Sequence, residues 1–241
     1  MKTALVIPTY NERENVRPLV EAIRAEAPGS FIVIVDDNSP DGTGEVAESV
    51  ALTFSDIHVI HRPRKQGYGR ALTAGFRYVL EHIPEADSLL TMDADFSHQP
   101  RYLPALIEAL ARHDVVIGSR YSGGGGVENW SVHRRILSRL GNRYVRWVAG
   151  LRLADCTSGF VAYRRKVIES IPLESLHAQG YSFLIEMKFR CSRRGFSTIE
   201  IPIVFVERQR GASKMSAQIA VEAVMLVWKL RFRPAREIGG C

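Results

Sequence analysis

The chain has 241 residues, 46% hydrophobic and 24% charged, so it is long enough for a sizeable core and ordinary for a globular protein. Its formal net charge of +6 favours an anionic partner, whether nucleic acid, anionic lipid or a phosphorylated substrate. The scattered cysteines, Cys156, Cys191 and Cys241, have neither metal-ligand spacing nor an evident disulfide framework, which indicates a reducing compartment. No stretch approaches the roughly 20 apolar residues that span a bilayer, so we expect a soluble or peripheral protein.

Strands and helices alternate through the first half of the chain. Apolar runs predict five strands, at Ala4–Pro8, Phe31–Val35, Ile57–Ile60, Ser88–Met92 and Asp114–Ile117. Helical patterns lie between them, at Asn11–Ala27, Gly44–Leu52, Ala71–Glu81 and Tyr102–Ala111. This alternation indicates an α/β fold whose mostly parallel, doubly wound sheet has helices on both faces. Because crossovers are right-handed, the loops after the strands share one edge of the sheet, where we expect Pro8–Glu12, Asp36–Asp41 and Asp93–Gln99 to converge.

The second half is less regular. A glycine-rich loop at Ser122–Gly126 precedes a helix over Trp130–Val148, and strands are expected at Asp155–Tyr163 and Ile199–Val206. A last apolar helix covers Ala217–Leu230. With no internal repeat and no linker, we expect one domain over residues 1–230, followed by a basic tail at 231–241.

Two carboxylates follow the predicted strand that ends at Met92. Asp93 and Asp95 lie one residue apart, at the strand end where open α/β sheets bind ligands. Two like charges this close repel each other unless a cation or water separates them. Oxygen ligands of this kind suit magnesium or manganese, which can also hold a substrate diphosphate. The simpler alternative is an exposed Asp-Ala-Asp turn.

Several short motifs occur in a fixed order, and together they carry a resemblance. The chain resembles the family 2 glycosyltransferases, and within them the dolichol-phosphate (polyprenol-phosphate) mannose synthases. The resemblance implies a GT-A fold and an inverting transfer of mannose from GDP-mannose to a polyprenol monophosphate, with a magnesium or manganese cofactor. It covers residues 3–230 and rests on Pro8-Thr9-Tyr10-Asn11-Glu12, Asp36-Asp37-Asn38-Ser39-Pro40-Asp41-Gly42-Thr43, Gly67-Tyr68-Gly69, Asp93-Ala94-Asp95, His98-Gln99-Pro100, Gly118-Ser119-Arg120-Tyr121 and Thr157-Ser158-Gly159-Phe160.

The resemblance also implies roles for particular residues. Asp93 and Asp95 would hold the metal, with Gln99 as a further contact, and Asp95 and Arg120 are the candidates for the chemical step. One departure is Asn38, where many members of the family have glycine; asparagine tolerates the left-handed conformation, so the turn should survive. The residues implied to bind the donor are Pro8, Tyr10, Glu12, Val35, Asp37, Asp93, Ala94, Asp95, Arg120, Arg208 and Lys214.

The predicted helix over Trp130–Val148 carries basic residues on one face. Arg135, Arg139, Arg143 and Arg146 recur at steps of four, four and three, and no acidic residue lies between His133 and Gly150. Such one-sided charge fits an anionic membrane surface as well as a plain solvated face. We expect residues 131–148 and 215–230 to be membrane-interface helices on the cytoplasmic face. Arg134, Arg135 and Ser138 are the candidates for binding the acceptor phosphate.

Other interpretations remain open from the sequence. The acidic residues Glu12 and Asp37 are common in helix first turns and loops, and the basic run Arg208–Lys214 is a solvated segment or a clamp over a diphosphate. Rival functions are the transfer of glucose or another sugar, and a nucleotide-sugar binding protein without turnover. A nucleic-acid binder is disfavoured because no nucleic-acid motif is present. Without a spanning helix, the chain resembles catalytic subunits that need a membrane partner, or a fragment of a larger polypeptide.

Overall fold

The structure is a computed structural model, and it describes residues 1–176, 180–207 and 217–232 of the chain. Seven strands form one sheet in the order β3-β2-β1-β4-β7-β5-β8, and β6 pairs with β9 in a second, two-stranded sheet. The strands are β1 Thr3–Thr9, β2 Phe31–Asp36, β3 Ile57–His61, β4 Ser88–Thr91, β5 Val115–Ser119, β6 Gly126–Glu128, β7 Val161–Arg164, β8 Thr198–Pro202 and β9 Val204–Val206.

Eight α-helices and two short 3₁₀ turns lie in the described part of the chain. The helices are α1 Arg13–Glu26, α2 Thr43–Ala51, α3 Tyr68–His82, α4 Leu103–Ala109, α5 Val132–Ala149, α6 Arg165–Ser170, α7 Gly180–Arg193 and α8 Ala217–Phe232, and the 3₁₀ turns are η1 Pro100–Tyr102 and η2 Leu173–Ser175. In the large sheet only β7 runs antiparallel to its neighbours, β4 and β5. The predicted α/β fold with a mostly parallel sheet is therefore confirmed.

Two of the predicted strands are wrong in extent. The strand expected at Asp155–Tyr163 begins only at Val161, because residues 155–160 form a loop whose polar groups bond to other segments. The strand expected at Ile199–Val206 divides at Ile203 into β8 and β9, which belong to different sheets. Gly126, expected in the glycine loop, begins β6. The α5 helix starts at Val132, two residues later than expected.

Helix α7 has no counterpart among the sequence predictions. Its buried face carries Glu186, Lys188 and Arg190 among apolar residues, so the sequence lacks the apolar periodicity of an amphipathic helix. These charges are satisfied inside the protein: Arg190 Nη2 donates to Glu186 at 2.7 Å, and Lys188 Nζ donates to the Ser158 carbonyl at 2.7 Å. The contact of Lys188 with Ser158 joins residues 30 positions apart and leaves no local sequence signal.

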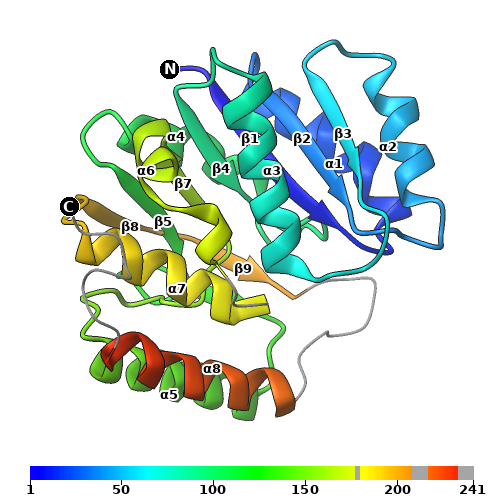
Figure 1. Ribbon diagram of the computed structural model, residues 1–241. Helices are drawn as coiled ribbons and strands as arrows, with labels where there is room; N and C mark the ends of the chain where they lie inside the picture. The colour runs from blue at the N-terminus through cyan, green and yellow to red at the C-terminus, as the bar shows by residue number, and fades with distance from the viewer. Residues whose placement is uncertain (177–179, 208–216, 233–241) are drawn as a thin grey trace.

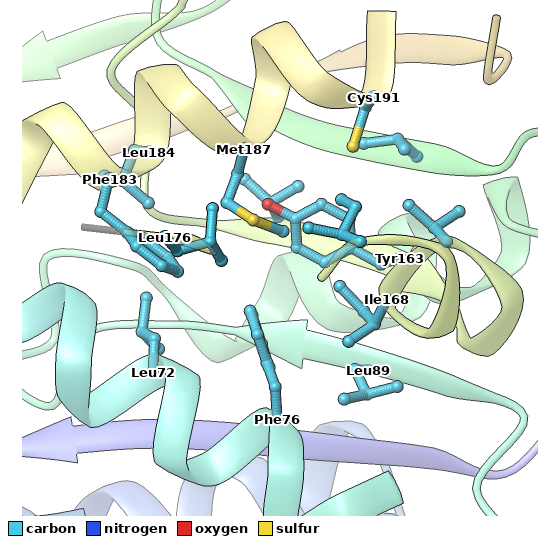
Figure 2. Close-up of a cluster of buried hydrophobic side chains, with 14 of the residues drawn as sticks. Leu72, Phe76, Leu89, Tyr163, Ile168, Leu176, Phe183, Leu184, Met187 and Cys191 are labelled. Carbon is cyan, nitrogen blue, oxygen red and sulfur yellow. The ribbon is translucent and has the colours of Figure 1, made fainter. Parts of the chain in front are cut away.

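The sheet separates two hydrophobic cores. One core lies between the sheet and helices α1, α2 and α4, and the other lies between the sheet and helices α3, α6 and α7. Figure 2 shows the second core, where Phe76 of α3 packs against both Tyr163 of β7 and Phe183 of α7. Burial raises the pKa of Tyr163 well above its ordinary value.

Helices α5 and α8 pack side by side at one end of the molecule, with α7 between them and the sheet (Figure 1). Apolar side chains are exposed on both helices, including Val132, Ile136, Leu140 and Trp147 on α5 and Trp228 on α8. No helix in the described ranges is both long and apolar enough to cross a membrane.

Asp114, the residue before β5, forms an ion pair with α6 and hydrogen bonds with the segment before β8. Asp114 Oδ1 lies 2.6 Å from Lys166 Nζ, and Asp114 Oδ2 accepts hydrogen bonds from the amide and hydroxyl of Ser197 at 3.0 and 2.8 Å. Partial burial would raise the pKa of Asp114, but the contacts with Lys166 and Ser197 lower it to about 2.

We expect Asp114→Asn to lower the free energy of unfolding by about 1 kcal/mol near neutral pH, because Lys166 is solvent-exposed and screened. A lowered folded-state pKa stabilises the protein above the unfolded-state value of about 4, and the contribution is lost as the pH falls towards 2. Urea unfolding at about pH 7, 4 and 3 should show the difference from the unsubstituted protein shrinking with acid. Lys166→Gln should behave alike, and a pH-independent difference would contradict this electrostatic account.

Candidate active site

The loops after β1, β2 and β4 meet at one edge of the sheet, as predicted. These three strands are neighbours and run parallel. The first two loops are bonded directly: the Glu12 amide donates to Thr43 Oγ1 at 2.9 Å, and the Asp37 amide donates to the Thr9 carbonyl at 3.0 Å. Asn38 has φ +59°, so the left-handed turn expected at that position is present.

Asp37 is buried and its carboxylate is fully held by the loop after β3. Its oxygens accept hydrogen bonds from the amides of Gln66 and Gly67, at 3.0 and 2.7 Å, and from Arg62 at 2.5 Å. Burial lowers the pKa of Arg62, and Asp37 partly restores it. The loop at residues 62–67 is thereby fixed beside Tyr10, whose ring lies 3.7 Å from Lys65 Nζ.

The two carboxylates after β4 differ in their surroundings. Asp95 is buried, and its Oδ1 accepts hydrogen bonds from the Ser97 hydroxyl at 2.6 Å and the Ser97 amide at 3.1 Å. Asp93 is partly exposed, but its Oδ1 is buried and has no hydrogen-bond partner among the described residues. A buried carboxylate oxygen without a donor is costly, so this atom has an unmet need for a cation or a donor group.

His98 positions the first of these carboxylates. Its Nδ1 accepts the Asp93 amide at 2.9 Å, its ring stacks on Phe160 at 5.0 Å, and Phe205 meets its ring edge-on at 5.5 Å. Burial lowers the pKa of His98, against the opposing charges of Asp93 and Asp95. A neutral ring with Nδ1 as acceptor fits both observations. The sequence placed His98 in the motif His98-Gln99-Pro100 but did not predict its bond to the Asp93 amide.

The residues present suit a hard divalent cation that keeps other ligands. The described ranges contain no group of three or more histidine, cysteine or acidic side chains arranged to hold a metal ion. Two carboxylates with one unsatisfied oxygen fit a magnesium- or manganese-type ion that also binds waters or substrate phosphates. Gln99, the third expected ligand, donates its side-chain nitrogen to the Phe96 carbonyl at 2.8 Å.

Arg120 lies in a buried ion pair that the sequence did not predict. Its Nε and Nη2 donate to the two oxygens of Asp155, each at 2.7 Å, and Nη2 also reaches Thr157 Oγ1 at 2.7 Å. Burial would raise the pKa of Asp155, but Arg120 lowers it. Arg120 is therefore held rigidly at the end of β5.

Aromatic rings connect Arg120 to helix α5. Trp130 lies 5.6 Å from the Arg120 guanidinium and 4.1 Å from that of Arg134, and its ring meets Phe205 edge-on at 5.5 Å. Arg134 also pairs with Glu207. On the same face of α5, Ser138 Oγ accepts a hydrogen bond from the Tyr121 hydroxyl at 2.6 Å.

The structure brings together most, but not all, of the predicted site residues. Pro8, Tyr10 and Glu12 lie partly buried at the end of β1. Val35 is fully buried, so its side chain belongs to the core. Arg135 is exposed on α5, whereas Arg134 and Ser138 of the same helix are partly buried. Ala94 is buried between the two aspartates, and Arg208 and Lys214 fall outside the described residues.

Sequence reasoning missed the residues that fix the Arg120 side of the site, namely Asp155 and the residues that bind its loop. The loop at 154–157 carries Asp155, and Asn142 and Glu200 hold this loop: Asn142 Oδ1 accepts the Cys156 amide at 2.7 Å, and Glu200 accepts the amides of Ala154 and Asp155 at 2.7 and 2.8 Å. An acid one residue before the Cys-Thr-Ser-Gly run was the only local signal for Asp155.

We expect Asp155→Leu to lower the free energy of unfolding by about 3–5 kcal/mol, because it leaves the Arg120 charge buried without a partner. The double variant Arg120→Met/Asp155→Leu should recover a substantial part of that loss, since neither charge remains. Urea unfolding measures both. The matched control is the more exposed pair of Arg24 and Asp56, whose side chains are 32% and 24% exposed; there, Asp56→Leu should cost less than about 1 kcal/mol. A double variant no more stable than Asp155→Leu would contradict the account.

The glycosyl transferase family 2 model matches residues 4–171, and the chain belongs to this family. It is 45% identical to the undecaprenyl-phosphate mannosyltransferase of Micrococcus luteus, over 97% of this chain and 96% of that protein. It is 44% identical to the polyprenol monophosphomannose synthase of Mycolicibacterium smegmatis, over 99% of this chain and 91% of that protein.

A solved structure confirms the fold. Glucosyl-3-phosphoglycerate synthase from Mycobacterium tuberculosis, in complex with Mn²⁺, uridine diphosphate and phosphoglyceric acid, superposes with a TM-score of 0.68. The match has 18% sequence identity and covers 97% of this chain and 79% of that one. The protein is thus a glycosyltransferase with a GT-A fold.

Proposed function

We propose that this family 2 glycosyltransferase transfers mannose from GDP-mannose to a polyprenol (dolichyl-type) monophosphate. Attack in line with the departing GDP would invert the anomeric carbon and give a β-linked polyprenyl phosphate mannose. Two relatives at 44–45% identity, an undecaprenyl-phosphate mannosyltransferase and a polyprenol monophosphomannose synthase, support the reaction. In this proposal residues 1–230 form a single catalytic domain.

One run of contacts carries the proposal. It begins at Asp93, passes through the rings of His98, Phe205 and Trp130, and ends at Arg134 on α5. A carboxylate pair suited to a metal-bound diphosphate is therefore joined, through packed rings, to a cationic cluster suited to a second phosphate. A transferase that moves a sugar from a diphosphate to a phosphate needs this pairing of sites.

On the donor side, the nucleotide would bind near Pro8, Tyr10, Glu12 and Asp37, where the first two loops are held by hydrogen bonds. Asp93 and Asp95, with Gln99 nearby, would hold magnesium or manganese. When bound, the ion would supply positive charge to the diphosphate leaving group. Arg208 and Lys214 keep their sequence-based role as basic contacts to the donor phosphates.

On the acceptor side, the reaction does not need a strong general base. A phosphate monoester has its second pKa near about 6, so its oxygen is ionised at neutral pH. His98, the histidine nearest the carboxylates, already uses its Nδ1 to accept the Asp93 amide, and burial lowers its pKa. The acceptor needs positive charge instead, and Arg120, Arg134 and Ser138 lie together to provide contacts, with Arg135 further out on α5.

We expect turnover of GDP-mannose and a polyprenyl phosphate in the presence of manganese or magnesium, with loss of turnover on chelation. Asp95→Ala should lower kcat by about a hundredfold or more, because a charge contact to the leaving group is removed. Glu85→Ala, an exposed acid before β4, is the matched control. Undiminished turnover by Asp95→Ala would rule out its assignment, and a panel of other nucleotide sugars tests the choice of mannose.

The outer surface of α5 supports a peripheral position on the cytoplasmic face of a membrane. Its exposed side chains combine arginines, at positions 135, 139, 143 and 146, with Val132, Ile136 and Leu140. A basic and apolar surface of this kind suits an anionic bilayer. The same helix carries Arg134 and Ser138 on its inner side, so docking would bring the lipid phosphate to the site.

We expect Arg139→Glu/Arg143→Glu to weaken binding to anionic phospholipid vesicles at least about tenfold, since each basic residue near the surface contributes about 1 kcal/mol. Vesicle sedimentation measures this, and the difference should shrink at high salt. The control is Arg101→Glu/Arg112→Glu, which makes the same charge change beside α4. Equal weakening by both pairs would show a net-charge effect and would contradict a docking role for α5.

A further inference from the structure

Trp130 carries a buried hydrogen-bond donor that none of the described residues accepts. The side chain is 7% exposed, and its Nε1 has no hydrogen-bond partner in the part of the chain that the structure describes. The indole nitrogen can only donate, and buried donors are nearly always paired in native proteins. An unmet donor at this position therefore points to a group that arrives with a ligand.

The ring of Trp130 also organises the charges around it. The guanidinium of Arg134 lies 4.1 Å from the ring centre, and that of Arg120 lies 5.6 Å away. Stacking on an aromatic face uses the plane of a guanidinium and leaves its N–H edge for anions. The indole thus holds two like charges near each other, which would otherwise repel.

Both guanidinium edges are engaged by carboxylates, but to different degrees. Arg120 is buried against Asp155, which is 0% exposed, whereas Arg134 and Glu207 are 32% and 35% exposed. The Arg134–Glu207 contact is the one that water screens. A phosphate can therefore replace Glu207 at Arg134, while Arg120 stays fixed.

The start of α5 adds a further attraction for an anion. Trp130 lies two residues before Val132, where an 18-residue helix begins with no acidic residue in its first turn and no side-chain cap. The free amides and the positive end of the helix dipole are left uncompensated there. Asp or Glu in the first turn would cancel this field, and this sequence has neither.

We propose that Trp130 is an acceptor-binding residue: its Nε1–H donates to an oxygen of the acceptor phosphate, while its ring holds Arg134 for the same phosphate. This rests on the proposed function and adds a residue to it. The competing role is an apolar wall between the arginines. The two differ in the consequence of losing the N–H alone, because phenylalanine keeps a ring and removes the donor.

The experiment compares Trp130→Phe and Trp130→Leu in steady-state kinetics with a short polyprenyl phosphate in detergent. We expect Trp130→Phe to raise the KM for the polyprenyl phosphate about tenfold, the effect of one lost hydrogen bond to a charged group, with the KM for GDP-mannose unchanged. Trp130→Leu should raise it further, because Arg134 loses its stack. Tyr78→Phe, which removes one aromatic hydroxyl bonded to His58 at 3.2 Å, is the matched control.

A binding measurement keeps the test independent of turnover. The chain has three tryptophans, so Trp147→Phe/Trp228→Phe leaves Trp130 as the single fluorophore. Polyprenyl phosphate should shift its emission, and the unphosphorylated polyprenol should not. Three outcomes would each overturn the proposal. They are an unchanged KM for the polyprenyl phosphate in Trp130→Phe, an equal rise in both KM values together with a lower melting temperature, and a Trp130 emission spectrum that polyprenyl phosphate does not change. No turnover by the unsubstituted enzyme would instead refute the proposed function.

Discussion

The buried ion pair between Arg120 and Asp155 is the constraint on which the proposed acceptor side of the site depends. A charge pair withdrawn from water is costly unless its geometry is good and its other hydrogen-bonding groups are satisfied. Both conditions are met: the pair is bidentate, and Asp155 also accepts the amides of Arg120 and Thr157, at 3.1 and 3.2 Å. Because both charged groups need hydrogen-bond partners inside the protein, the loop at residues 154–160 is held in one conformation. The helices that pack on this loop, α5 and α7, are positioned by it.

Helices α5 and α7 meet the loop from different directions. Lys188 of α7 donates to the Ser158 carbonyl, and although burial lowers its pKa to about 8, Asp155 opposes that shift and favours the charged form. From α5, Asn142 bonds to Cys156 and Thr157. The surface helix is therefore joined by polar contacts to the centre of the site. Its orientation, and that of Arg134 on it, follows from the same network that holds Arg120.

Sequence patterns predicted the parts of the fold whose physics is local. The strands that end at Thr9, Asp36 and Thr91 follow from apolar runs, and the turn at Asn38 follows from a residue that tolerates positive φ. The partners of Arg120 could not be predicted, because Asp155 lies 35 residues away. Helix α7 could not be predicted either, because its charged residues are typical of an exposed segment, although they are buried in the structure. The buried Trp130 donor is visible only in three dimensions.

The two halves of the candidate site hold their charged side chains by different kinds of contact. On the proposed donor side, Asp37 and Asp95 are fixed by backbone amides, which cannot leave without unfolding a loop. On the proposed acceptor side, Arg134 is held by an aromatic face and a half-exposed carboxylate, both of which release it at modest cost. A nucleotide would enter such a site whole, so contacts that are already in place suit the proposed donor. A lipid phosphate would instead enter from the membrane surface. If it replaces Glu207 at Arg134, the arginine exchanges one anionic partner for another and is never left without one.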